Sequence, residues 1–206
     1  MDKNANVYIV DDDEELRASL VTLLSLRTPW QIMPFATGEE WLNAEHRLEP
    51  GCVLLDYSMP GISGLGVLEQ MRKAQSAHQT IMLTGEGNIS IAVQAMHAGA
   101  SDFIEKPVAF EALEKAVSAA LERLGSEMTA RLAAQEAKRL IERLTPRERD
   151  VMLSLADGLP NKVIANRMGL SVRTVEVYRA NLMDKLEVKS LADVIKLVFG
   201  AGLMRA

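Results

Sequence analysis

The strongest constraint on the fold is a strand-like apolar run that recurs five times within about the first 120 residues. Each run is followed by a stretch in which Leu, Val, Ile and Ala have the spacing of an amphipathic helix. The runs lie at residues 7–10, 31–35, 52–55, 80–83 and 102–104. This alternation predicts a parallel sheet with helices on both faces.

Polar side chains follow these runs at the points where the strands should end. Asp11 and Asp12 follow the first run, Asp56 the third, Thr84 the fourth and Lys106 comes shortly after the fifth. In an open parallel sheet, ligands bind beyond the carboxyl ends of the strands. We therefore expect three carboxylates, a hydroxyl and an amine to meet at one edge of the sheet.

Carboxylates gathered in this way raise one another's pKa unless a cation neutralises them, and oxygen ligands suit Mg²⁺. Simpler roles compete with this interpretation, since an Asp after a strand is often a helix N-cap and a Thr there is often a turn residue. We assign residues 13–15 to such a role, as acidic groups that complement a helix dipole. The five residues above fall at equivalent strand ends in order, which favours a magnesium site.

Four motifs carry a resemblance to a known family. The first 120 residues or so resemble the receiver domain of two-component response regulators, which implies a flavodoxin-like, doubly wound α/β fold with five parallel strands. The motifs are Val10-Asp11-Asp12, Leu55-Asp56-Tyr57-Ser58-Met59-Pro60-Gly61, Leu83-Thr84-Gly85 and Phe103-Ile104-Glu105-Lys106-Pro107.

The resemblance assigns roles to individual residues. A sensor histidine kinase would donate a phosphoryl group to Asp56. Mg²⁺ would be held by Asp12, Asp56 and the main-chain carbonyl of Ser58, with Asp11 acting through water. Lys106 would pair with the phosphoryl oxygens. Positioning and charge neutralisation are what phosphoryl transfer mainly requires of a protein.

The same resemblance implies a switch. Thr84 would turn to bond a phosphoryl oxygen, and Phe103 would move inward to fill the space left behind. The Lys106-Pro107 bond would be cis, an isomer that X-Pro bonds allow. Ser58 and Glu86 would flank the path of hydrolytic water, and the small Ser58 leaves the lifetime of the phosphoryl group open.

Composition narrows the class of protein. One cysteine excludes an intramolecular disulfide framework, and no apolar run reaches the roughly twenty residues that cross a bilayer. We expect a soluble cytoplasmic protein without membrane contact. Residues 1–125 carry 18 acidic and 9 basic side chains, whereas residues 145–206 carry 7 and 10. This asymmetry indicates an acidic domain followed by one that can approach nucleic acid.

Residues from Phe110 to about Leu144 have a continuous helical pattern in which Gly125 is the one expected interruption. Two apolar stripes run along it. They are Leu113, Val117, Leu121 and Leu124, and then Leu132, Leu140, Ile141 and Leu144. Pairing with a second chain through the exposed stripe and packing on the helix's own domain are both open.

A new unit starts at Thr145. Thr145-Pro146-Arg147-Glu148 is a capping box with Pro at the first helical position, and short helices follow it. Two of them are joined by a tight turn at Gly169, which indicates a helix-turn-helix. The segments at 144–148, 161–165, 174–177 and 185–190 resemble the LuxR/FixJ/NarL-type DNA-binding domain over its whole length.

Helical geometry separates the core face of the second of these helices from its DNA face. At 100° per residue, Val175, Leu182 and Leu186 share the core face with Tyr178 beside them. The residues expected to face the bases are Arg173, Glu176, Val177 and Ala180. The residues expected to reach phosphates are Lys162, Thr174, Arg179, Asn181, Lys185 and Lys189.

These features predict a phosphorylation-dependent transcriptional regulator and not an enzyme, beyond its own phosphoryl transfer and hydrolysis. The expected domains are a receiver at 1–122, a helical linker at 123–143 and an all-α DNA-binding domain at 144–206. Expected partners are a sensor histidine kinase, a double-stranded DNA operator and a second copy of the chain when phosphorylated. RNA polymerase is a further candidate partner.

Two other classes compete. A phosphatase with an aspartyl nucleophile needs a second acidic residue two positions later, where this chain has Ser58. A C-terminal domain that contacts protein instead of DNA is disfavoured by the outward Arg, Glu, Val and Ala set. For the dimer, we expect a surface that includes Ile89, Ile91 and Val108, apolar side chains that can bury one another across a two-fold axis.

Overall fold

The computed structural model describes residues 5–85 and 89–203. The chain folds into two compact units that divide between Ser126 and Glu127. We call them the sheet unit and the helical unit.

Among the described residues, the sheet unit contains five parallel strands, as the alternating pattern predicts, and their order is β2-β1-β3-β4-β5. The strands are β1 (Asn6–Val10), β2 (Gln31–Phe35), β3 (Gly51–Asp56), β4 (Gln79–Thr84) and β5 (Asp102–Glu105). Strand β3 is buried along its whole length, which agrees with its central place and its uninterrupted apolar sequence. The order reverses between β1 and β3, so the carboxyl ends of these two strands form the crevice where such sheets bind ligands.

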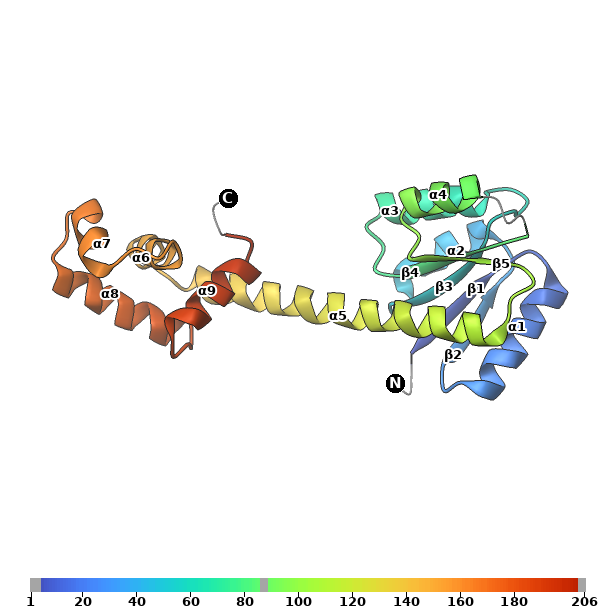
Figure 1. The fold of residues 1–206 in the computed structure, drawn as a ribbon, viewed down its shortest axis with the longest axis horizontal. Helices are drawn as coiled ribbons and strands as arrows, with labels where there is room; N and C mark the ends of the chain where they lie inside the picture. The colour runs from blue at the N-terminus through green and yellow to red at the C-terminus, as the bar shows by residue number, and fades with distance from the viewer. Residues whose placement is uncertain (1–4, 86–88, 204–206) are drawn as a thin grey trace. The chain divides into compact units, whose positions relative to one another are not determined.

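Helices cover both faces of the sheet (Figure 1). One face is covered by α1 (Glu14–Arg27) and the first part of α5 (Phe110–Glu142), the other by α2 (Gly38–Ala44), α3 (Gly64–Lys73) and α4 (Ile89–Ala98). A short 3-10 helix, η1 (Glu45–Arg47), follows α2. The sheet therefore has two apolar cores, one under each helical layer.

Local chemistry fixes where the helices next to the crevice begin. Asp13 caps α1 by accepting hydrogen bonds from the backbone N–H groups of Glu15 and Leu16, and Ser63 caps α3 in the same way. Gly64 is required at the start of α3, because a Cβ there would lie 2.0 Å from the carbonyl oxygen of Asp56. The segment from Gly61 to Gly64 is thus a turn into a helix.

The long helix α5 passes through Gly125 without interruption, in contrast to the expectation from the sequence. The structure also shows where the second apolar stripe, from Leu132 to Leu144, packs. Leu140, Ile141 and Leu144 are buried in the core of the helical unit, whereas Leu132 is 63% exposed. Most of that stripe is therefore used within the chain. The separate linker at 123–143 stays a prediction.

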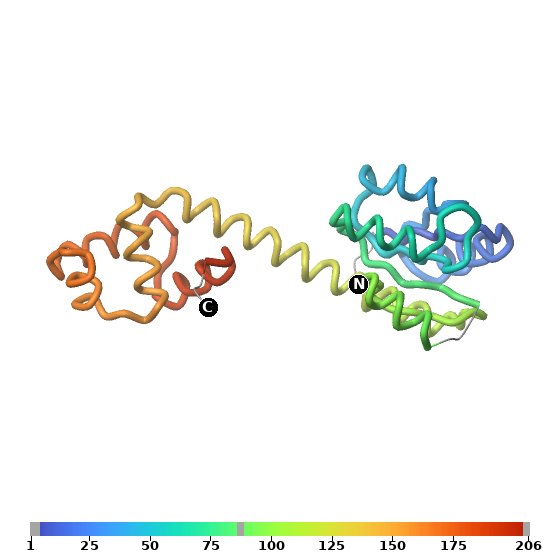
Figure 2. The backbone as a smooth tube through the Cα atoms, turned by 90° about the horizontal axis from the view of Figure 1, so that it is seen from above, coloured from blue at the N-terminus to red at the C-terminus, as the bar shows by residue number. Residues whose placement is uncertain are grey.

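The helical unit is formed by α6 (Pro146–Ala156), α7 (Asn161–Met168), α8 (Val172–Lys185) and α9 (Leu191–Gly200) together with the end of α5. These four helices gather into one group in Figure 2. The capping box at Thr145 is confirmed, and Gly169 ends α7 in the left-handed conformation with φ of 66°. The turn between α7 and α8 is therefore that of a helix-turn-helix. Within residues 5–85 and 89–203, no helix has the length and apolar character to cross a membrane.

Candidate functional site

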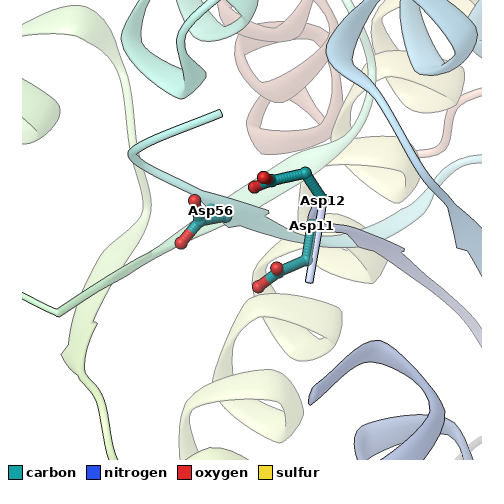
Figure 3. A group of neighbouring side chains, drawn as sticks. All are labelled: Asp11, Asp12 and Asp56. Carbon is teal, nitrogen blue, oxygen red and sulfur yellow. The ribbon is translucent and has the colours of Figure 1, made fainter. Parts of the chain in front are cut away.

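Three carboxylates meet at the carboxyl ends of β1 and β3 (Figure 3). Asp11 and Asp12 directly follow β1, and Asp56 is the last residue of β3. An oxygen from each carboxylate lies within 4.8 Å of the others. Asp11 and Asp56 are buried, whereas Asp12 is exposed. The sequence prediction that these groups converge is confirmed.

The ammonium of Lys106 joins this cluster from beyond β5. Its Nζ lies 2.6 Å from Oδ1 of Asp56 and 2.8 Å from Oδ2 of Asp11. The Lys106-Pro107 bond is cis, and the backbone N–H of Lys106 donates to the carbonyl of Thr84 at 2.7 Å. The loop after β5 is thereby tied to the end of β4, and the lysine side chain reaches across to β3 and β1.

Burial and charge act against each other in this cluster. Burial raises the pKa of Asp56 above its ordinary value, and the nearby charge of Asp11 adds to this, although hydrogen bonds from Lys106 and Ser58 oppose it. Burial alone would lower the pKa of Lys106, but its bonds to Asp11 and Asp56 raise it. Lys106 is therefore held as a cation beside Asp56, whose negative charge is disfavoured by burial.

The loop after β3 places backbone groups beside Asp56. The N–H of Ser58 donates to Oδ2 of Asp56 at 2.9 Å, and the N–H of Gly64 donates to the carbonyl of Tyr57 at 3.1 Å. The loop folds back closely over the end of the strand. This is possible because Gly64 has no side chain, whereas a Cβ there would collide with the backbone of Asp56. Ser58 itself is exposed next to the carboxylates.

The proposed switch residues lie on the two neighbouring strands. Thr84 ends β4 and is 2% exposed, and Phe103 lies on β5 and packs against the core under α2, α3 and α4. Glu86, expected to flank the path of hydrolytic water, lies outside the described residues.

A donor set made only of oxygens suits a hard divalent ion such as Mg²⁺. The buried, closely spaced carboxylates of Asp11 and Asp56 with the exposed carboxylate of Asp12 fit that ion, because two or three negative charges confined in this space need a cation for balance. Softer metals favour Cys or His ligands, and this cluster has neither.

The helix-turn-helix presents one exposed face. Val175, Leu182 and Leu186 are buried, as predicted, with Tyr178 packed beside them. The four side chains expected to face bases are all exposed, namely Arg173, Glu176, Val177 and Ala180. Val177 is 54% exposed, so its methyl groups are accessible to a partner.

Both units match known families. Residues 7–118 match the response regulator receiver domain, and residues 142–198 match the bacterial regulatory proteins of the LuxR family. The chain belongs to the two-component response regulators. Its LuxR-type second domain makes it a transcriptional regulator of the type represented by the FixJ proteins.

Full-length relatives support the assignment. The chain is 36% identical over 204 residues to the transcriptional regulatory protein FixJ of Bradyrhizobium diazoefficiens, covering 99% of both chains. It is 39% identical to FixJ of Azorhizobium caulinodans, covering 100% of this chain and 97% of the relative. The solved structure of the response regulator StyR matches with a TM-score of 0.79 and 34% identity, covering 95% of this chain and 98% of StyR.

The residues of this response regulator that were expected to contact DNA phosphates differ in how exposed they are. Lys162, Asn181 and Lys189 are exposed, and Arg179 is half-buried. The backbone N–H of Thr174 donates to Oγ of Ser171, the residue that caps α8. Their contacts with phosphates stay predictions.

Lys185, also expected to reach a phosphate, has a partner within the protein. Its ammonium lies 2.7 and 2.9 Å from the two carboxylate oxygens of Glu148. The reason is its place on α8, between the core residues Leu182 and Leu186, on the flank that packs against α6. Burial would raise the pKa of Glu148, but hydrogen bonds from Lys185 and Thr145 outweigh this and lower it. Sequence reasoning missed this pair, although the capping box had already placed Glu148 at a fixed point of α6.

The predicted dimer surface also needs a correction. Ile91 is buried, with 7% of its surface exposed, because Ile91, Ala95 and Ala98 form the face of α4 that packs on the sheet. The exposed apolar side chains of α4 are Ile89, Val93 and Met96. Val108 is half-buried and packs against the opposite core, under α1 and α5.

We predict that Lys185→Ala destabilises the helical unit by about 1–3 kcal/mol, because it leaves the buried carboxylate of Glu148 without its cation. Lys189→Ala, which removes an exposed lysine, should change stability little. Both tryptophans, Trp30 and Trp41, lie in the sheet unit. Urea unfolding followed by circular dichroism should therefore shift for Lys185→Ala, while the tryptophan fluorescence transition should stay near that of the parent.

The lowered pKa of Glu148 sets the pH dependence of this effect. The ion pair stabilises the fold at pH values above the ordinary glutamate pKa, and this contribution is lost as the pH falls through the lowered one. The difference between parent and Lys185→Ala should thus shrink in acid. A difference that persists there, or that Lys189→Ala reproduces at neutral pH, would contradict the structural role.

Proposed function

We propose that Asp56 accepts a phosphoryl group from a sensor histidine kinase and that this modification controls operator binding by the helix-turn-helix. The observation that carries the proposal is the position of Lys106, whose ammonium lies within 3 Å of the carboxylates of both Asp56 and Asp11. A cation held there is placed to neutralise phosphoryl oxygens on Asp56. The chain's own chemistry in this proposal is limited to phosphoryl transfer and hydrolysis.

Each residue at the edge of the sheet has a part in that transfer. A carboxylate oxygen of Asp56 would form a bond to phosphorus as the bond to the donor breaks. Asp12, Asp56 and the main-chain carbonyl of Ser58 would hold Mg²⁺, and Asp11 would act through water. The ion supplies charge neutralisation for the phosphoryl oxygens when it is bound. Lys106 would move from the carboxylates to the new phosphoryl oxygens.

The state of Asp56 would be transmitted by two strands. Thr84 would turn toward a phosphoryl oxygen, and Phe103 would move inward on the neighbouring strand. What supports this pair is their location, since Thr84 is buried at the end of β4 and Phe103 lies on β5, hydrogen-bonded to it. In a closely packed interior, a shift of one side chain requires a compensating shift of its neighbour.

We predict that incubation with a small phosphoryl donor and Mg²⁺ labels the parent chain and not Asp56→Asn. Asp13→Asn serves as the matched control, since Asp13 is the N-cap of α1 and should leave labelling intact. Intact-protein mass spectrometry detects the added phosphoryl group. Labelling of Asp56→Asn to the extent of the parent would show that another residue is the acceptor.

The helix-turn-helix would read a double-stranded operator. In this proposal Arg173, Glu176, Val177 and Ala180 meet base edges, while Lys189 and the other polar residues around them reach phosphates. Glu176 can accept from cytosine N4, and Val177 and Ala180 can contact thymine methyl groups. Support comes from the shared exposed face of α8, an arrangement that a helix covered by its own domain would not have.

We predict that Glu176→Gln or Val177→Ala changes the preference among operator variants. Lys189→Ala should instead weaken binding to every duplex alike and reduce the salt slope of log K by about one. Lys196→Ala, an exposed lysine on α9 outside this surface, is the control of equal charge. Titration of labelled duplexes at several salt concentrations measures both effects, and equal losses on all sequences from Glu176→Gln would refute the proposed base contact.

Phosphorylation would tighten operator binding by pairing two sheet units. A first bound DNA-binding domain then raises the local concentration of the second, which strengthens binding without a new base contact. The candidate surface in this proposal is the outer face of α4. It is supported by the exposure of its apolar side chains, since Ile89 is 82% exposed and Val93 and Met96 are each 49% exposed. RNA polymerase stays a candidate partner of the DNA-bound form.

We predict that a phosphoryl mimic converts the parent from monomer to dimer and that Ile89→Glu or Val93→Glu prevents this, because a charge would be buried in the new interface. Leu26→Glu places the same charge on α1, at a side chain 80% exposed, and should still dimerise. Light scattering coupled to size exclusion gives the mass. Dimerisation of the two α4 variants at the parental concentration would exclude this surface.

A further inference from the structure

The loop between β1 and α1 determines where the carboxylate of Asp12 lies. Besides the bond from Lys106 to the Asp11 carboxylate, three hydrogen bonds among the described residues hold that loop at Asp11. The backbone N–H of Asp11 donates to the carbonyl of Phe35 at 3.3 Å, and the N–H of Asp13 donates to Oδ1 of Asp11 at 2.9 Å. The third and shortest joins Nη1 of Arg17 to the carbonyl oxygen of Asp11 at 2.7 Å. Arg17 is the one of these partners that contributes a side chain from helix α1.

The carbonyl that Arg17 binds belongs to the peptide bond between Asp11 and Asp12. Because the peptide group is planar, fixing the direction of this carbonyl also fixes the plane that contains the backbone N and Cα of Asp12. Asp12 is exposed, and Lys106 is bonded to Asp11 and Asp56 instead. The orientation of the Asp12 carboxylate therefore depends strongly on the backbone that carries it.

We propose that Arg17 is a positioning residue for Mg²⁺, holding the Asp11–Asp12 peptide so that the Asp12 carboxylate faces Asp56. Arg17 makes no contact with the ion in this proposal, which rests on the magnesium role assigned to the three carboxylates above. It is the sole basic residue between positions 4 and 26, so no other arginine or lysine of this segment can replace it.

Charge alone predicts the opposite effect. Arg17 is a cation close to a site for a cation, so its removal should strengthen Mg²⁺ binding if its charge were all that mattered. If Arg17 positions the loop, its removal should weaken Mg²⁺ binding despite the lost repulsion. The sign of the change in affinity thus separates the two roles.

The test is calorimetric titration of the full chain with MgCl₂ in the absence of any phosphoryl donor. We expect Arg17→Ala to bind Mg²⁺ about tenfold more weakly than the parent, the lower end of what residues supporting metal ligands contribute. Arg17→Lys, which keeps the charge and can still donate a hydrogen bond, should fall between the two. Arg72→Ala is the matched control. Arg72 lies on α3, and its Nη1 also donates to a backbone carbonyl, that of His97 at 3.0 Å.

A structural defect is recognised separately, from tryptophan fluorescence during urea unfolding in Mg²⁺-free buffer. Arg17→Ala and Arg72→Ala should lose comparable stability there, and only Arg17→Ala should lose Mg²⁺ affinity. Affinity for Mg²⁺ equal to or above that of the parent would overturn the positioning role, and Arg17→Lys decides by the same criterion if Arg17→Ala does not fold. A parent chain that does not bind Mg²⁺ would instead refute the magnesium site itself.

Discussion

The sheet unit depends on a balance of charge at the ends of its two central strands. Asp11 and Asp56 are buried side by side because β1 and β3 are neighbours, and Lys106 supplies a cation from beyond β5, with β4 lying between. Its long side chain spans that interval. The carboxyl ends of three strands are thereby linked through one ammonium group, so a change of charge on Asp56 acts on all of them at once.

The helical unit uses the same pairing of a shielded carboxylate with a lysine for a different purpose. Glu148 caps α6 at Thr145 and at the same time accepts two hydrogen bonds from Lys185 on α8. The pair fixes α8, which carries the proposed base contacts, against α6. In the sheet unit the lysine faces a site where phosphorylation is proposed to change the charge, whereas in the helical unit the pair joins two packed helices.

The sequence identified the site well because strand ends are a simple periodic signal, and Asp11, Asp56 and Thr84 lie at or directly after a strand end. The sequence predicted less reliably which face of a helix is buried, because two faces of one helix can both be apolar. On α4, Ile91, Ala95 and Ala98 share one face and Ile89, Val93 and Met96 another with the same spacing, so periodicity cannot decide which is buried. The ion pair of Lys185 and the hydrogen bond of Arg17 were overlooked because their partners come from other segments, which no local pattern reveals.

This division of α4 bears on how the state of Asp56 could reach the surface. Phe103 packs against the same core as Ala95 and Ala98, the residues through which α4 rests on the sheet. An inward movement of Phe103 must therefore be accommodated beneath α4, because a close-packed core does not absorb a displaced ring locally. The helix would shift as a body and carry its outer residues with it. In the proposed switch, the buried face of α4 would thus receive the change, and the exposed face, with Ile89 and Val93, would present it to a second chain.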